Sequence, residues 1–147
     1  MDYKIVKAQK EHLPEIERLI ISTRISEGLN EQDKTAKFWV AIKDKRVIGC
    51  GGFNLIDSKN VYLTHLAVEK DLRRKGVGMS IFGKLMEEAE KLKAETVSFI
   101  TMYYHFNKFK KRGFRTIPRK ELNEPLRSYP LYTSPRYKKC AVMIKEN

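Results

Sequence analysis

Short runs of apolar residues between turn residues predict seven strands along the chain. They lie at residues 3–8, 38–42, 47–55, 61–68, 96–101, 114–117 and 139–144. Only a tight turn at Asp44-Lys45 separates the second strand from the third, so we expect a hairpin there. No helix interrupts the strands between residues 38 and 68, which favours an antiparallel meander.

Apolar residues at helical spacing predict two long helices, each with one buried face. The first begins near Pro14, which suits the first turn of a helix. The second covers residues 77–93, and its expected buried stripe is Val77, Ile81, Leu85, Ala89 and Leu92. Shorter helices are expected after Asn30 and over residues 104–112, where Gly113 ends the helix. The proline-containing stretch after residue 117 is expected to be mostly loop.

The order of these elements predicts a mixed α+β domain with a single sheet. A strand, a long helix and another strand follow one another between residues 61 and 101. This order favours one parallel crossover in an otherwise antiparallel sheet. The chain has 147 residues, a length that fits one domain, so we expect residues 1–147 to form a single domain.

The composition is typical of a globular protein without a membrane span. Hydrophobic residues make up 41% of the chain, and no apolar run reaches the roughly 18 residues that a span requires. No signal-peptide segment follows the first residues, so a cytoplasmic location is expected. Cys50 and Cys140 lie far apart in strand-like runs and form no disulfide framework.

Positive charge is concentrated in the last third of the chain. The net charge is +12, and residues 103–147 alone contain 12 Lys and Arg against 3 Asp and Glu. A solvated basic surface, a nucleic-acid-binding surface and a site for an anionic small ligand would each account for this excess. Charge alone does not separate the three explanations.

The most informative segment joins the strand at residues 61–68 to the long helix. Its sequence, Arg73-Arg74-Lys75-Gly76-Val77-Gly78, places three cations and two glycines at a helix start. The first N–H groups of a helix have no partner within the helix, and the helix dipole adds a partial positive charge there. Glycines also let a phosphate come close to the backbone. The segment predicts a pyrophosphate site, and an ordinary basic loop is the alternative.

The residues after the glycines exclude two other phosphate-binding motifs. The phosphate loop of nucleotide hydrolases requires Gly-Lys-Ser/Thr, whereas Gly78 is followed by Met79-Ser80. The dinucleotide fingerprint requires a third glycine, and this chain has Ile81 there.

Two segments carry a resemblance to a known family. With Leu66-Ala67-Val68 before it, Arg73-x-x-Gly76-x-Gly78 resembles the acetyl-CoA signature of the GNAT N-acetyltransferase superfamily. Phe109-Lys110-Lys111-Arg112-Gly113-Phe114 is similar to that family's aromatic-x-Lys-x-Gly-Phe segment. The resemblance covers nearly the whole chain. It implies a splayed pair of strands at residues 61–68 and 96–101, with the pantetheine arm of acetyl-CoA between them.

The resemblance also implies which residues bind the cofactor. The backbone of Leu66, Ala67 and Val68 is expected to pair with pantetheine and to stabilise the oxyanion of the reaction. The pyrophosphate is expected at the turn formed by Arg73, Arg74, Lys75, Gly76, Val77, Gly78 and Met79. Phe109 stands where relatives often have a tyrosine, so it is expected to pack against the cofactor arm and not to donate a proton.

Departures from the superfamily pattern affect the acid–base groups most. Tyr62 stands where many relatives have a glutamate base, Met102 where asparagine is common, and Lys70 where proline is frequent. Two catalytic candidates remain: His65 as a general base, and Tyr104 as the acid that protonates the departing thiolate. A packed histidine is the alternative for His65, and an aromatic packed in the core or on the cofactor is the alternative for Tyr104. The thiolate of coenzyme A is a tolerable leaving group near neutral pH, so its direct departure, or its protonation by water, is the alternative to a side-chain acid.

The expected acceptor of the acetyl group is an amine. The tail has a looser resemblance to amino-acid N-acetyltransferases such as the glutamate enzymes, in Thr101, Phe109-x-x-x-Gly113-Phe114, Leu122-x-x-Pro125-Leu126 and Cys140-Ala141-Val142-Met143. It favours the α-amine of a small amino acid, with Arg24 and Arg127 as candidates for binding the carboxylate. A lysine or N-terminal amine of a protein is the alternative within the enzyme class.

Two other kinds of site are weighed against this interpretation. No metal is expected, because His12, His65 and His105 have no cysteine or carboxylate at a metal-ligand spacing. A nucleic-acid-binding module is the rival class, because tyrosines are interleaved with the cations of the tail. The glycine-containing turn at Arg73–Gly78 favours the enzyme, since a nucleic-acid binder has no need of such a turn. Whether the chain forms a homodimer is left open.

Overall fold

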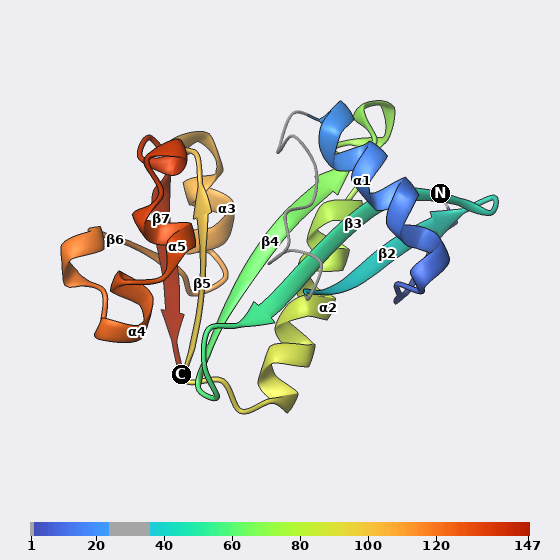
Figure 1. The fold of residues 1–147 in the computed structure, drawn as a ribbon. Helices are drawn as coiled ribbons and strands as arrows, with labels where there is room; N and C mark the ends of the chain where they lie inside the picture. The colour runs from blue at the N-terminus through green and yellow to red at the C-terminus, as the bar shows by residue number, and fades with distance from the viewer. Residues whose placement is uncertain (1, 24–35) are drawn as a thin grey trace. The chain divides into compact units, whose positions relative to one another are not determined.

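The computed structural model describes residues 2–23 and 36–147. It contains a seven-stranded sheet with the strand order β1-β2-β3-β4-β5-β7-β6 (Figure 1). The chain divides into two compact units, Met1–Asn54 with Leu63–Lys91 and Leu55–Tyr62 with Leu92–Asn147. Each unit is described separately below.

The first unit is built on antiparallel strands. β1 (Lys4–Lys7) pairs with β2 (Lys37–Lys43), and β2 pairs with β3 (Arg46–Leu55). The hairpin expected at Asp44-Lys45 is confirmed, and both residues have positive φ, at 50° and 65°. β4 (Asn60–Val68) follows β3 in the opposite direction (Figure 1).

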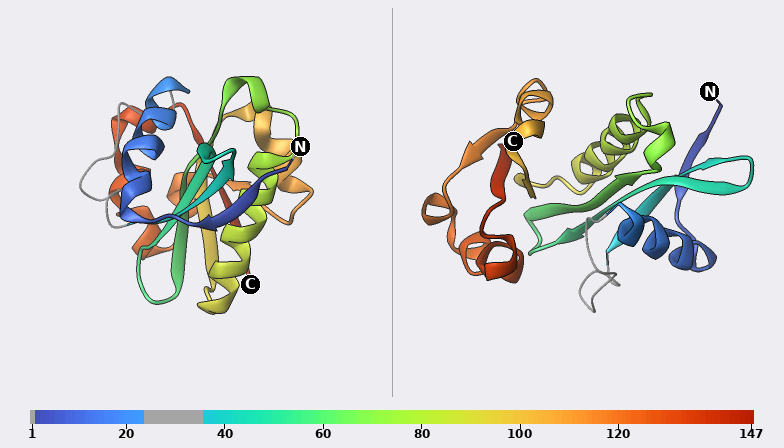
Figure 2. Two further views of the ribbon diagram at one scale, coloured as in Figure 1. Left: turned by 90° about the vertical axis from the view of Figure 1, so that its right-hand side faces the viewer. Right: turned by 90° about the horizontal axis from the view of Figure 1, so that it is seen from above.

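Two helices cover opposite faces of these strands (Figure 2). α1 (Leu13–Ser22), which the 3-10 turn η1 (Lys10–His12) precedes, buries Ile16, Leu19 and Ile20. These side chains form one core cluster with Phe38, Val40, Val47, Cys50 and Ala67. α2 (Val77–Lys91) lies on the other face, where Cβ atoms added at Gly49 and Gly51 would come within 2.9 and 2.8 Å of Ile81. The two glycines therefore let α2 pack closely on β3.

The buried stripe expected on the long helix is confirmed at Val77, Ile81, Leu85 and Ala89. The prediction for Leu92 was wrong, because its side chain is 38% exposed. The helix ends at Lys91, one residue earlier, so Leu92 no longer follows the helical spacing.

The second unit contains the other strands. β5 (Thr96–Thr101) and β6 (Arg115–Ile117) each pair antiparallel with β7 (Ala141–Glu146). The first residues of β4, Asn60–Tyr62, pair parallel with Thr96–Ser98, which confirms the expected parallel crossover. The splay of these two strands stays an expectation from the family resemblance.

Helices and turns of the second unit pack on both faces of β5. η4 (Tyr103–His105) leads into α3 (Phe106–Lys110), and Gly113, at φ 91°, follows it. On one face Phe99 contacts Phe109 and Phe114. On the other face the buried Ser98 hydroxyl hydrogen-bonds the Tyr132 hydroxyl at 2.5 Å.

The stretch expected to be mostly loop contains short helices, so that prediction was wrong. They are η5 (Arg119–Glu121), α4 (Glu124–Arg127), α5 (Pro130–Thr133) and η6 (Pro135–Tyr137). Prolines stand in the first turns of the last three helices, where the N–H that proline lacks is not needed. The Asn123 side chain also caps α4 by accepting from the Leu126 N–H.

Two further expectations concern a short helix and membrane spans. The short helix expected after Asn30 lies outside the described residues. Within residues 2–23 and 36–147, no helix combines the length and the apolar character that a membrane span requires.

Candidate functional site

The basic glycine turn lies in the first unit, between β4 and α2. The 3-10 turn η3 (Lys70–Leu72) leads to Arg73, whose Nε donates to the Val68 carbonyl at 3.4 Å. Arg74 and Gly76 have positive φ values of 64° and 84°. Left-handed residues in a turn are typical of backbone concavities that bind anions. The side chains of residues 73–75 are exposed, so their charges are available to such a ligand.

The glycines leave space beside this turn. A Cβ added at Gly76 would meet nothing within 4 Å, and one added at Gly78 would meet only a Val68 methyl at 3.4 Å. The Ser80 N–H donates to the Gly76 carbonyl at 2.9 Å, which is the first bond of the helical ladder. The N–H groups of residues 77–79 come before that bond and have no acceptor one turn back in the helix. The residues present therefore fit a pyrophosphate.

The strand segment Leu66–Val68 belongs to the same unit as the turn. Ala67 is buried in the cluster with α1. Leu66 points to the opposite face, where its Cδ1 would lie 3.1 Å from a Cβ added at Gly51. This alternation is that of an ordinary strand, so the backbone continues as a strand up to the turn.

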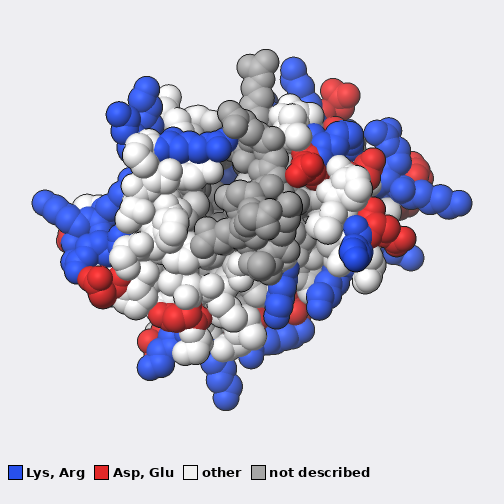
Figure 3. All heavy atoms as spheres, in the orientation of Figure 1, with Lys and Arg blue, Asp and Glu red and all other residues white. Residues whose placement is uncertain are grey.

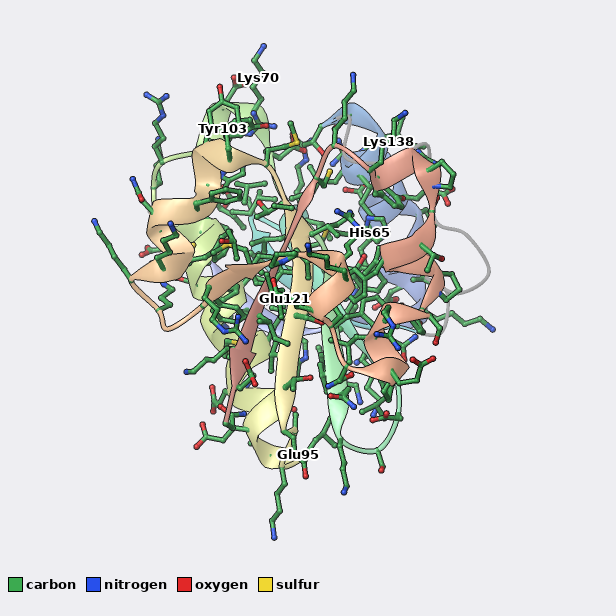
Figure 4. The ribbon with its side chains drawn as sticks, turned by 90° about the vertical axis from the view of Figure 1, so that its left-hand side faces the viewer. His65, Lys70, Glu95, Tyr103, Glu121 and Lys138 are labelled. Atoms are coloured by element: carbon green, nitrogen blue, oxygen red, sulfur yellow. The ribbon has the colours of Figure 1, made fainter. Side chains whose placement is uncertain are left out.

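His65 interrupts this strand geometry. It has a φ of 53°, which is uncommon for a residue other than glycine and indicates a bulge in β4. Its ring stacks on Phe38, with centroids 6.3 Å apart and planes at 23°. The His65 side chain is half-buried, whereas Lys70 is exposed and projects outward (Figure 4). The structure thus places His65 beside the segment that is expected to bind the cofactor, and its role as a base stays a prediction.

Phe109 lies in the second unit and is 5% exposed. Its ring meets Phe99 at 4.7 Å and Phe114 at 6.5 Å between centroids. The Lys108 ammonium lies 5.5 Å from the centre of the Phe109 ring. Phe109 is therefore a core residue of this unit, and its contact with the cofactor arm stays a prediction.

Tyr104 lies in η4 and is 66% exposed, next to Tyr103, which is 75% exposed. The two rings meet edge to face at 5.5 Å, and the His105 ring lies 4.5 Å from that of Tyr104. Burial, and to a smaller extent the Lys108 charge, lower the pKa of His105, which favours its neutral form. The exposed Tyr104 hydroxyl can meet a ligand from solvent, and its role as an acid stays a prediction.

Two arginines, Arg24 and Arg127, are expected to bind a carboxylate. Arg24 lies outside the described residues. Arg127, in α4, forms an ion pair with Glu124 one turn earlier, and both side chains are exposed. A substrate carboxylate would either bind the other N–H groups of this guanidinium or replace Glu124.

The structure shows two polar groups that the sequence did not single out. Arg119 donates to three backbone carbonyls, those of Tyr132, Tyr137 and Cys140, at 3.0, 2.8 and 2.9 Å. Nothing in the pattern around Arg119 indicates these contacts, because they join separate turns. Cys50 is the other group, and its thiol donates to the His65 carbonyl at 3.4 Å. Glycines on both sides of Cys50 were a signal, since glycine inside a strand indicates a bulge or a close approach.

Two further findings concern the surface charge and metal binding. Figure 3 shows one face of the molecule, on which many Lys and Arg side chains project beside fewer Asp and Glu. In the part of the chain that the structure describes, no group of three or more His, Cys, Asp or Glu side chains is arranged to hold a metal ion.

Comparison with solved structures supports the fold. Rv2747 from Mycobacterium tuberculosis, solved in complex with CoA, has a TM-score of 0.83 at 22% identity, over 98% of this chain and 99% of that chain. A GNAT family acetyltransferase from Elizabethkingia anophelis, solved with acetyl-CoA bound, has a TM-score of 0.74 at 15% identity, over 99% and 98% of the two chains.

N-acetylglutamate synthase from Neisseria gonorrhoeae, solved with coenzyme A and N-acetyl-glutamate, also has this fold. Its TM-score is 0.81 at 18% identity, over 99% of this chain and 35% of that chain. This chain therefore spans about a third of the synthase, and at such identities the likeness shows the fold alone.

Sequence comparison identifies the family. Among curated proteins, none matches the sequence. The sequence profile of the acetyltransferase (GNAT) family matches residues 5–114, which include β4, the basic glycine turn and the Phe109–Phe114 segment. The chain belongs to the GNAT family and is an acetyltransferase with acetyl-CoA as its co-substrate.

Proposed function

We propose that the protein transfers the acetyl group of acetyl-CoA to the α-amine of a small amino acid or a similar compound. The proposed binding site of acetyl-CoA is the turn Arg73–Met79, because glycines, exposed cations and helix N–H groups coincide there. The likeness to N-acetylglutamate synthase and the charge of residues 103–147 support an anionic amino acid as the acceptor.

The chemistry that we propose is direct attack of a neutral amine on the thioester carbonyl. The nitrogen forms a bond to the carbonyl carbon, and the backbone N–H groups of Leu66 and Val68 stabilise the oxyanion. The C–S bond then breaks and the thiolate leaves, with Tyr104 as its proton donor. The nitrogen, which carries one surplus proton after attack, releases that proton to water, and Tyr104 regains a proton from water. His65, at the left-handed turn of β4, would take the proton of the ammonium before attack.

Binding of the acceptor is proposed for Arg127, which already has a carboxylate partner in Glu124. Arg24 is proposed as a second carboxylate ligand. A peptide amine is the alternative acceptor. The cytoplasmic location, the single domain over residues 1–147 and a homodimer stay predictions.

A mass-spectrometric screen tests the acceptor. The protein is incubated with acetyl-CoA and, separately, with free amino acids, their amides and short peptides, and acetylated products are counted. We expect the largest turnover with an acidic amino acid or its amide. Efficient acetylation of peptides together with poor acetylation of every free amino acid would overturn the proposed acceptor and leave the cofactor site intact.

A further inference from the structure

His65 takes a left-handed backbone conformation within β4. Past this turn, pairing with β3 resumes, because the Glu69 N–H donates to the Ile48 carbonyl at 2.8 Å. A residue with positive φ rotates its neighbouring peptide groups away from the regular ladder. Such a residue persists only where the surrounding structure holds it in place.

Cys50 meets the two peptide groups that follow His65. Its thiol donates to the His65 carbonyl at 3.4 Å, and the Ala67 backbone N–H donates to its sulfur. Cys50 is fully buried in the cluster with α1, where a thiol is cheaper to bury than a hydroxyl. Burial raises the pKa of the thiol to about 12, so the side chain keeps its proton and remains a donor at neutral pH.

The His65 side chain is held from the same face. Phe38 stacks on the imidazole and also covers Gly52, where an added Cβ would lie 2.9 Å from the Phe38 ring. β3 thus contributes a glycine, Gly52, over which the Phe38 ring can lie, and the Cys50 thiol, which contacts the backbone at His65. Both features come from the glycine-rich sequence Gly49-Cys50-Gly51-Gly52.

We propose that Cys50 is a positioning residue, whose thiol holds the left-handed turn at His65 and so orients the backbone of Leu66–Val68 toward acetyl-CoA. This inference rests on the proposed function, in which the N–H groups of Leu66 and Val68, on either side of the Ala67 N–H that Cys50 holds, stabilise the oxyanion. Fixed dipoles act strongly on a transition state because they need no reorientation during the reaction. If the thiol is lost, one of the contacts that hold these dipoles is lost, and the preorganisation is weakened.

Two substitutions separate the hydrogen bonds of Cys50 from its packing. Valine at this position fills a similar volume and can form neither bond, whereas serine can both donate and accept. We expect Cys50→Val to lower kcat by about tenfold, less than the hundredfold or more that follows loss of an oxyanion donor. Cys50→Ser should recover most of kcat. Val40→Ala is the matched control, since Val40 is buried in the same cluster and pairs with Cys50 across β2 and β3. It should lower the melting temperature and leave kcat near that of the parent.

A second measurement reports the turn without turnover. NMR on the ligand-free protein measures two quantities, amide hydrogen exchange at Ala67 and the backbone coupling constant of His65. Both should change in Cys50→Val. Both should stay near the parent values in Val40→Ala. Unchanged exchange and unchanged kcat in Cys50→Val would overturn the inference, as would an equal loss of kcat in the serine and valine variants. A parent protein that acetylates no amine would overturn the proposed function, and the NMR measurement would still decide whether Cys50 holds the turn.

Discussion

Phe99 and Phe109 meet edge to face, with ring centroids 4.7 Å apart, and this contact joins β5 to α3. Because Phe109 is almost fully buried, Phe109→Ala should lower the free energy of unfolding by about 3–5 kcal/mol. Urea denaturation measures this loss. A loss below about 1 kcal/mol would show that the ring is not a core residue.

Phe109→Tyr tests a different property of the same position. Since phenylalanine cannot donate a proton, the enzyme is expected to work without an acid here, and the added hydroxyl should change kcat little. Steady-state kinetics of the variant and the parent with the same amine acceptor measures this change in kcat. A large gain in kcat would show that the missing hydroxyl limits the rate.

Tyr104→Phe tests the proposed acid. We expect kcat to fall by about a hundredfold, at the lower end of the range for general acid catalysis. Tyr103→Phe is the matched control, because it removes a hydroxyl from the neighbouring exposed tyrosine. Equal kcat values in the two variants would exclude Tyr104 as the acid.

Arg127→Ala tests the proposed carboxylate ligand. The Michaelis constant for the amine should rise by about tenfold while that for acetyl-CoA stays nearly unchanged, because the lost contact binds the acceptor equally in the ground state and the transition state. Arg136→Ala, at another exposed arginine of the same unit, should change neither constant. If the constant for the amine also stays at the parent value in Arg127→Ala, Arg127 does not bind the acceptor.

Asp57 makes stability depend on pH in the acid range. Hydrogen bonds from the Lys59 N–H and from Asn60 lower the pKa of Asp57 below its ordinary value of 3.8. A carboxylate with a lowered pKa stabilises the fold above its unfolded pKa, and the stabilisation is lost as pH falls through the folded pKa. Asp57→Ala should therefore destabilise the protein at pH 7 and reduce the loss of stability on acidification. Asp44→Ala, at an exposed carboxylate, is the control, and equal pH profiles for the two variants would contradict this account.

Strong local patterns allowed much of the fold to be predicted. β5 was predicted at its observed bounds, and α2 was predicted to within two residues, because long periodic segments carry their own signal. The short helices between residues 118 and 138 were missed, because four-residue helices depend on caps and on prolines in their first turns and not on periodicity.

The candidate site could be predicted only where its chemistry is local in sequence. The glycine turn has its cations, glycines and helix start within one segment. The contacts of Cys50 with β4 and of Arg119 with three carbonyls join residues that are distant in sequence. The glycines beside Cys50 indicate a close approach but not its partner, and no pattern around Arg119 indicates its contacts, so only packing brings these residues together.

The central claim is that acetyl-CoA binds at the turn Arg73–Met79, and melting temperatures measured with and without acetyl-CoA test it most directly. A ligand that binds the native state raises the melting temperature. The parent should show this rise, and Gly78→Glu should abolish it, because the added side chain brings bulk and negative charge beside the helix N-terminus. Gly83→Glu, at an exposed position of the same helix where an added Cβ meets nothing within 4 Å, should retain the full rise. Equal rises in the Gly78→Glu variant and the parent would contradict the claim and place the cofactor elsewhere.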